Sequence, residues 1–562
     1  MNESFHPGSY GTLIDKALAA LQSAHITERI WTRDYTVWKP SPAEISNRFG
    51  WLDSPWNMED RRAEINAVVE TVRRDGYRHA LLLGMGGSSL APETFRKIFG
   101  VRKGFLELAI LDSTDPATVL SLARSIDLSR TLFIVATKSG GTVETFSFMK
   151  YFYNQTLAAL GREEAGRHFI AITDPDSGIA DWADRLHFRH TFLNDPDIGG
   201  RFSALSCFGL VPGALMGMDI GRLLAFARQE GEREKAPLPD KTTVISAALL
   251  GAVLGELAKA GRDKATFFLS PQIESFGAWL EQLIAESTGK DGQGILPIVG
   301  EAPGLPEVYG DDRVFINVSL GEDNPHHDLL ATLRAAGHPV MELSMEEPYA
   351  LGGQIFRSEM ATAVAGQRLG INPFDQPDVE AAKILARQMI AAYREQGKFP
   401  EETPVRSSEN MDIFGDAASL SEFLVRAKAG NYVALQAYAA PTRRLDLALA
   451  DLRRRLRDRY RLATTAGYGP RYLHSTGQLH KGDRGAGLFI QITTTDREDA
   501  PIPDEPGQPS SSVTFGALKA AQAMGDRQAL ISSGRRVIRL HIRKDLLGEL
   551  GRMTFNIKDE LP

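Results

Sequence analysis

The sequence predicts an α/β protein built on parallel, doubly wound sheets. Short apolar runs, such as residues 79–83 and 131–136, alternate with helical stretches of about ten to fifteen residues. Glycine- and hydroxyl-rich turns follow several of these runs. Such turns are typical of the carboxyl ends of parallel strands, where ligands of this fold class bind.

Length and composition narrow the class of protein further. A chain of 562 residues is too long for one hydrophobic core, so several domains are expected. The net charge of −7 disfavours a general binder of nucleic acid or membrane surfaces, so any anionic substrate must be held by a local cluster of basic residues. The single cysteine, Cys207, excludes an intrachain disulfide. Neither a secretion signal nor a membrane span is visible, so a cytoplasmic protein is expected.

The first part of the chain is expected to be a helical, tryptophan-rich lead-in over residues 1–75, followed by a first α/β domain over 76–230. Its first strand runs into the turn GMGGSS at 84–89. This turn lacks the third glycine of a dinucleotide-binding fingerprint, because Ser89 occupies that position. A phosphate-facing turn is the better interpretation. Two further strands end at Asp112 and Asp174.

A second turn of the same domain organises the rest of the chain. The predicted strand at 131–136 leads into Thr137, Lys138, Ser139, Gly140, Gly141 and Thr142, and a helix begins directly afterwards. Hydroxyls, glycines and one ammonium group at a helix N-terminus favour an anion. The alternative is an ordinary capped turn, but capping needs only one hydroxyl. The GxxxxGK[ST] order of a P-loop is absent.

The remaining chain is expected to contain a second α/β domain, a linker and a third α/β domain. The second domain, over residues 240–400, repeats the alternation of strand and helix, with strands at ATFFLS, VFINVS and PVMELS. Polar residues 401–430 are interpreted as a linker with a helix in it. The C-terminal domain is placed over residues 431–562.

Three side chains could carry chemistry. Glu286 ends a helix with an apolar face and could act as a base, although an exposed glutamate near a glycine stop is the simpler alternative. Arg201 follows two glycines and could stabilise negative charge, or it could be a surface arginine paired with Asp195 or Asp197. Lys383 could donate a proton to a sugar oxygen, although an exposed helix lysine is commoner.

Histidines supply further candidates. His474 and His480 lie in the polar segment GPRYLHSTGQLHKGD and could act as acid or base near neutral pH. A polar loop histidine is more often without a catalytic role. No convincing metal-ligand spacing is present.

Six segments taken together resemble the glucose-6-phosphate isomerase family. They occur in the family's order over about residues 80–385, and are GMGGSS, DSTDPA, TKSGGTVET, GGRFSALS, ESTGK and NPFDQPDVEAAK. The whole chain, with its YLHSTGQLHKG segment, looks most like the isomerase half of bifunctional transaldolase/glucose-6-phosphate isomerase proteins. It has no room for a transaldolase barrel.

The resemblance implies two sugar-isomerase domains and interconversion of glucose 6-phosphate and fructose 6-phosphate through a cis-enediol, without metal or cofactor. It implies that Glu286 moves the proton between C2 and C1, that Arg201 steadies the enediolate, and that Lys383 with a histidine opens the ring. The phosphate and sugar would be held by Gly87, Ser88, Thr137, Lys138, Ser139, Thr142, Gln282 and Gln376.

Two departures from the family's pattern matter. Thr137 stands where the family commonly has serine, which keeps the hydroxyl. The family's ring-opening histidine usually lies between the glutamate and the late lysine, but here no histidine in that interval has the expected context. We therefore expect His474, with His480 second, to be delivered by the C-terminal domain. In many members of the family this histidine comes from a neighbouring subunit.

Two other functions are compatible with the sequence. The same domain type also serves in non-catalytic sugar-phosphate sensors, and an isomerase could also accept mannose 6-phosphate. The resemblance leaves room for a homodimer and for a separately encoded transaldolase partner. No nucleic-acid or membrane partner is expected.

Overall fold

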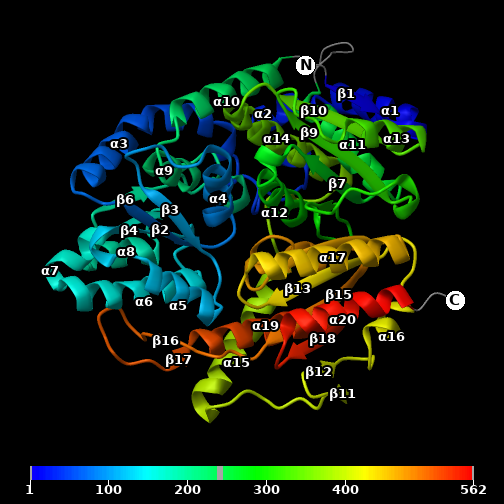
Figure 1. Ribbon diagram of the computed structural model, residues 1–562. Coiled ribbons are helices and arrows are strands. Elements are labelled where there is room, and N and C mark those ends of the chain that lie inside the picture. Colours follow the sequence, from blue (N-terminus) through cyan, green and yellow to red (C-terminus); the bar gives the residue numbers. More distant parts are fainter. Residues whose placement is uncertain (1–2, 237–244, 560–562) are drawn as a thin grey trace.

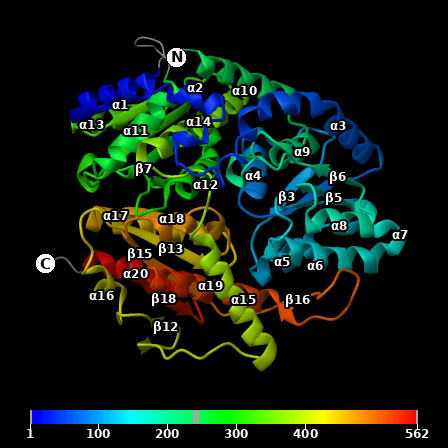
Figure 2. The ribbon, with the colours of Figure 1, turned by 180° about the vertical axis from the view of Figure 1, so that it is seen from behind.

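The computed structural model describes residues 3–236 and 245–559 and confirms the predicted α/β class. Three larger sheets are present in these residues, together with a two-stranded one, β16 (Pro501–Ile502) and β17 (Val513–Thr514). The three large sheets lie in separate lobes around α12 (Phe276–Thr288), as both ribbon views show (Figures 1 and 2). The middle of the molecule is therefore reached by segments of all three lobes.

The first sheet is parallel and has the order β3-β2-β4-β5-β6. Its strands are β2 (His79–Gly84), β3 (Glu107–Leu111), β4 (Thr131–Ala136), β5 (Phe169–Thr173) and β6 (His190–Leu193). The chain reverses its direction of winding between β2 and β4, where Gly84 pairs with Ala136. The two glycine-rich turns leave neighbouring strands at this reversal, which is where doubly wound sheets bind ligands.

The second sheet, β1-β10-β9-β7-β8, is parallel except for β1. Its strands are β1 (Ser4–His6), β7 (Lys264–Leu269), β8 (Leu296–Ile298), β9 (Arg313–Leu320) and β10 (Val340–Met345). The short strands β1 and β8 were not expected. Through β1, the start of the chain joins a sheet whose other strands lie more than 250 residues later, so the N-terminal segment contributes a strand to the second lobe.

The third sheet is mixed and has the order β11-β12-β18-β15-β13-β14. Its strands are β11 (Arg406–Ser407), β12 (Met411–Phe414), β13 (Tyr432–Tyr438), β14 (Ala463–Tyr468), β15 (Gly487–Thr494) and β18 (Arg536–Ile542). Strand β12 pairs antiparallel with β18. Residues 401–430, expected to be a linker, thus supply two strands to this sheet.

The helices cover the sheets and connect the lobes. Those of the first lobe and the N-terminal segment are α1 (Gly11–Ser23), α2 (Ile26–Trp31), α3 (Ser54–Arg74), α4 (Gly87–Phe99), α5 (Pro116–Ser125), α6 (Val143–Leu160), α7 (Arg162–Ala165), α8 (Gly178–Arg185), α9 (Cys207–Leu215) and α10 (Ile220–Lys235). Those of the other lobes are α11 (Ala247–Lys259), α13 (His327–Ala335), α14 (Leu351–Leu369), α15 (Val379–Gln396), α16 (Leu420–Leu424), α17 (Arg443–Tyr460), α18 (Gly477–Gly482), α19 (Phe515–Ser532) and α20 (Leu546–Asp559).

Tryptophan side chains fasten the N-terminal segment to α14. Trp31 stacks on Phe356 with 5.8 Å between ring centroids, and Trp38 donates from its indole N–H to the Ala363 carbonyl at 2.8 Å.

Cys207 is fully buried, and burial raises the pKa of its thiol to about 11, as expected for a packing residue. Among the described helices, none is long and apolar enough to span a membrane.

Candidate active site

The C-terminal end of α12 carries Glu286. The buried face of this helix anchors it through residues such as Trp279 and Leu283, while the Glu286 side chain is only 13% exposed. Its Oε1 lies 3.0 Å from the Arg201 guanidinium, and its Oε2 accepts from the Gln282 amide at 3.0 Å. Glu286 is therefore a partly enclosed carboxylate with two fixed donors, not an exposed glutamate beside a glycine.

Arg201 is the most enclosed of the candidate charged residues, with 3% of its side chain exposed. It donates to Ser287 Oγ at 2.9 Å, to Gln376 Oε1 at 2.8 Å and to the Asp375 carbonyl at 2.7 Å. Burial lowers the pKa of this guanidinium, against the opposing charge of Glu286. The alternative of a surface arginine is wrong.

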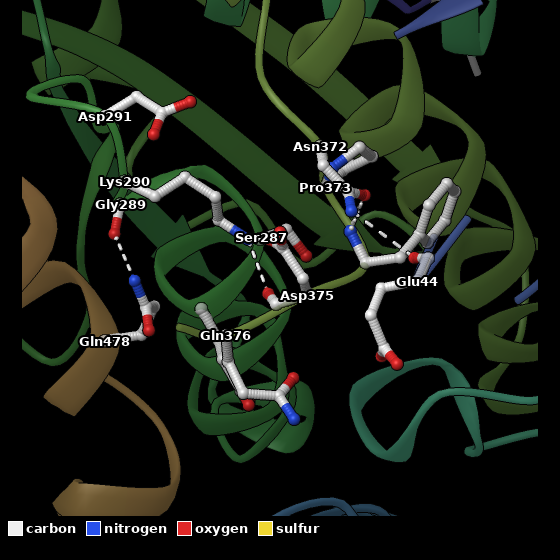
Figure 3. A network of polar contacts seen from close by, with 12 residues as sticks. Glu44, Ser287, Gly289, Lys290, Asp291, Asn372, Pro373, Asp375, Gln376 and Gln478 are labelled. Carbon is white, nitrogen blue, oxygen red and sulfur yellow. Dashed lines mark hydrogen bonds and ion pairs between the residues drawn. The ribbon is translucent and has the colours of Figure 1, made fainter. Parts of the chain in front are cut away.

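The segment between α14 and α15 forms the wall behind Arg201. Lys290 is buried and reaches Asp375 Oδ1 at 2.7 Å, and Gln478 of α18 donates to the Gly289 carbonyl at 2.9 Å (Figure 3). Burial, together with the charge of Arg201, lowers the pKa of Lys290 to about 8. Residues of the C-terminal lobe thus contact the loop that directly follows Glu286.

The predicted phosphate loop connects β4 to α6. Thr137 donates to the Thr142 hydroxyl at 3.1 Å, and Thr142, the N-cap residue of α6, makes no side-chain cap hydrogen bond. The N-terminus of a helix suits an anion through its N–H groups and its dipole. The Lys138 ammonium pairs with Asp174 and donates to the Pro196 carbonyl at 2.9 Å, so its charge is shared with a carboxylate.

The turn after β2 packs tightly against its neighbours. A Cβ on Gly87 would lie 1.9 Å from the Gly200 carbonyl oxygen, so only glycine fits there. A Cβ on Gly86, whose φ is +54°, would lie 3.0 Å from the Gln282 amide and from the His474 carbonyl. The glycines allow other segments of the chain to approach closely. Ser88, which is 8% exposed, is the second residue of α4.

His474 lies in a cavity of about 490 Å³. It ends the short 3₁₀ turn Arg471–His474, and its Nε2 lies 3.0 Å from Glu144 Oε1. Burial opposes ionisation of Glu144, but the neighbouring His474 holds the pKa of that carboxyl below its usual value. Lys383 of α15, Ser139 and Thr142 line the same cavity.

His480, the second candidate, has a different setting. It is 2% exposed and packs on Phe489, with 5.0 Å between the ring centroids. Burial lowers the pKa of its imidazole well below the usual value. It is not among the residues that line the cavity.

The predicted residues fall into three sets. The cavity is lined by Ser139, Thr142, Lys383 and His474, and the polar network comprises Arg201, Glu286 and Gln376. The two glycine-rich turns hold Gly87, Ser88, Thr137 and Lys138. Gln282 joins the first two of these sets, because its amide also donates to the His474 carbonyl at 2.8 Å.

Two residues that the sequence did not indicate belong to this site. Glu144 contacts His474, and Gln522 of α19 donates to the same Glu144 oxygen at 2.7 Å. A glutamate in the first turn of a helix suits the helix dipole, but nothing local marks it as a partner for a histidine 330 positions later.

Comparison with known proteins agrees with this architecture. The fold defines an α/β protein with parallel, doubly wound sheets, and solved structures share it. A crystal structure of a hypothetical protein from Thermus thermophilus is similar at a TM-score of 0.57 and 26% identity, covering 69% of this chain and 100% of that one. A glucose-6-phosphate isomerase from Chlamydia trachomatis shares the fold at a TM-score of 0.57 and 19% identity, covering 69% of this chain and 87% of that one.

Sequence relatives identify the family. The phosphoglucose isomerase family model matches residues 67–294. Glucose-6-phosphate isomerases of Thermus thermophilus and Rubrobacter xylanophilus are each 31% identical, over 404 and 402 residues, covering 62% and 61% of this chain and 91% and 90% of the relatives. The chain belongs to the phosphoglucose isomerase family. More than a third of it lies outside these matches.

Proposed function

We propose that this chain interconverts glucose 6-phosphate and fructose 6-phosphate by opening the sugar ring and moving a proton between C2 and C1 through a cis-enediol. Family membership supports the reaction, and one contact supports the assignment of residues. The Gln282 amide lies 3.0 Å from the Glu286 carboxylate and 2.8 Å from the His474 carbonyl. The Gln282 side chain thus contacts both the candidate base, Glu286, and the backbone of the candidate ring-opening residue, His474.

The phosphate is assigned to the loop between β4 and α6. Ser139 and Thr142 line the cavity, and the N-terminus of α6 adds N–H groups and a favourable dipole. Ser88, Thr137 and Lys138 complete the binding set in this proposal. Binding energy from the phosphate, remote from the reacting carbons, then serves to orient the sugar.

Ring opening is assigned to His474 and Lys383. Opening a hemiacetal removes the proton from the O1 hydroxyl and delivers one to the ring oxygen. His474, whose Nε2 is hydrogen-bonded to Glu144, and the Lys383 ammonium lie on the same cavity and can share these two transfers.

Proton transfer between the carbons is assigned to Glu286. The carboxylate removes the C2 proton, the C1–C2 double bond forms and the C1 carbonyl oxygen takes the negative charge of the enediolate. The O2 hydroxyl proton then passes to O1, and return of the first proton to C1 leaves the carbonyl group at C2, which gives the ketose. The buried Arg201 guanidinium, held at 2.8 Å by Gln376, supplies a fixed positive charge for that enediolate.

Replacing the base tests the proposal. Glu286→Gln keeps the size and a hydrogen-bonding group but cannot accept a proton, so we expect kcat to fall by about 10³-fold or more while the Kd for a sugar phosphate stays nearly unchanged. Loss of deuterium from C2 of labelled glucose 6-phosphate, followed by NMR, measures the step. Glu274→Gln, at an exposed position just ahead of α12, is the matched control. Full turnover by Glu286→Gln would remove Glu286 from the role.

Other expectations accompany this function. A coupled assay for fructose 6-phosphate separates an isomerase from a non-catalytic sugar-phosphate sensor, and the same assay with mannose 6-phosphate measures substrate range. A cytoplasmic location, a homodimer and a separate transaldolase partner stay predictions.

A further inference from the structure

Arg471 lies three residues before His474 and contacts the first lobe. Its guanidinium forms an ion pair with Glu93 of α4, and its Nε lies 3.3 Å from Asp112 Oδ2 at the end of β3. The three side chains are 27%, 15% and 12% exposed, so the ion pairs are largely shielded from water. Ser89 donates to the same Asp112 oxygen at 3.2 Å, which fixes the acceptor.

The second lobe also faces this arginine. The charge of Arg471 acts on Glu281 of α12 and favours the ionised form of that carboxyl group. Burial raises the pKa of Glu281 to about 7, against this effect. Arg471 therefore occupies the point where a turn of the C-terminal lobe meets acidic residues of both other lobes.

The end of β3 makes two more contacts of the same kind. Thr114 donates to Gln522 at 2.8 Å, and the buried Asp115 pairs with Lys519 at 2.8 Å. Three polar side chains of the DSTDPA segment thus contact the C-terminal lobe. Two of these contacts are with residues near His474. Asp112 contacts Arg471, and Thr114 contacts Gln522, whose amide donates to Glu144.

We propose that Arg471 is a positioning residue for ring opening, which holds the turn carrying His474 against Glu93 and Asp112 so that the imidazole stays on Glu144. The proposal rests on the function assigned to His474 above. A 3₁₀ turn rises about 2 Å per residue, so Arg471 and His474 are separated by roughly 6 Å along its axis and a shift of the anchor moves the imidazole directly. A misplacement of about 1 Å can cost roughly a hundredfold in rate.

The experiment measures ring opening by itself. Opening and reclosing of the ring interconverts the α and β anomers, and NMR magnetisation exchange records that rate even when Glu286→Gln blocks proton transfer. In the Glu286→Gln background we expect Arg471→Met to lower anomer exchange about ten- to a hundredfold with little change in substrate Kd. Arg471→Lys, which keeps the charge but not the forked geometry, should recover part of the rate.

A double-variant cycle distinguishes positioning from a general structural role. If Arg471 acts through His474, then adding Arg471→Met to His474→Gln should change kcat by less than about twofold. Arg484→Gln is the control, since Arg484 also bridges lobes, through Asp263 at 3.0 Å, but lies outside the site. We expect it to leave the anomer exchange rate unchanged.

The remaining outcomes contradict either the positioning role of Arg471 or the proposed function of the chain. An equal loss from Arg471→Met with and without His474, or no loss at all, overturns the positioning role. Inactivity of the unmodified enzyme toward glucose 6-phosphate overturns the proposed function instead. Thermal unfolding identifies a variant that does not fold, and Arg471→Lys then carries the test.

Discussion

Glu359 of α14 is a carboxyl group in the core, with 1% of the residue exposed. Its Oε1 has no hydrogen-bond partner among the described residues, and burial raises the pKa of this group well above its usual value. Burial therefore favours the neutral form of this group more strongly in the folded chain than in the unfolded chain. A neutral acid in such a place makes stability depend on pH.

The sign follows from the raised pKa. Below about pH 4 both states are protonated and Glu359 has no pH effect; as pH rises, ionisation favours the unfolded state, so the free energy of unfolding falls until the folded pKa is reached. Glu359→Gln cannot ionise, so its unfolding free energy, relative to the original protein, should rise as the pH increases above about 5. Denaturant titrations at several pH values measure this. Glu274→Gln, at an exposed position, is the control variant, and parallel curves for Glu359→Gln and the original protein would contradict the prediction.

Contacts of single residues divide into those that a sequence can predict and those that it cannot. Gln282 and Glu286 are four residues apart on one helix, so their hydrogen bond follows from helical geometry. The bond from Gln282 to the His474 carbonyl spans 192 positions and no local pattern indicates it. The same holds for Glu144 and Arg471, whose partners become neighbours only when the lobes assemble.

At the scale of elements, α18 packs on the loop that follows α12. A Cβ on Gly289 would lie 2.2 Å from Leu479 Cα, and a Cβ on Gly482 would lie 2.3 Å from the Gly289 carbonyl oxygen. These two glycines let the C-terminal lobe approach within contact of the segment that begins at Glu286.

Gly289→Ala tests this close approach. The added methyl group must push α18 away from α12, so we expect a loss of about 1–3 kcal/mol in unfolding free energy and about a tenfold lower kcat, as the His474 turn moves with α18. Denaturant unfolding and steady-state kinetics measure both. Gly551→Ala in α20 is the matched control, because its added Cβ would meet no described atom within 4 Å apart from its chain neighbours and the backbone of its own helix. Unchanged kcat and stability in Gly289→Ala would show that α18 can move freely.

Long apolar strands followed by helices were predictable, and three-residue strands were not. The strands β2, β4, β7 and β9 appear in the sequence as apolar runs that end at turns. Strands β1 and β8 have three residues each, which is too short for an alternation of apolar and polar residues to be recognised. They form because the neighbouring strands have unpaired backbone N–H and C=O groups at the edges of the sheet.

At the scale of the whole molecule, the site draws on all three lobes of one chain. The first lobe supplies the predicted phosphate loop and Glu144, the second supplies Glu286, and the third supplies His474. In this arrangement one copy of the chain contains every group that the proposed mechanism uses.

Co-expression of two inactive variants tests this completeness. If His474 acts within its own chain, Glu286→Gln mixed with His474→Gln should give only the sum of their residual activities. If a partner supplied the histidine, a randomly mixed dimer would regain roughly a quarter of the original activity, because about half of the pairs would each hold one intact site. Differently tagged copies, purified together and assayed, distinguish the two results; matched wild-type copies with the same tags are the control.

If His474 opens the sugar ring, as proposed, its position also sets when turnover can begin during synthesis of the chain. Glu286 is translated 188 residues before His474, a delay of roughly 10–40 s at the usual rate of about 5–20 residues per second. A nascent chain without the C-terminal lobe lacks the proposed ring-opening group, so turnover begins only when that lobe has been made.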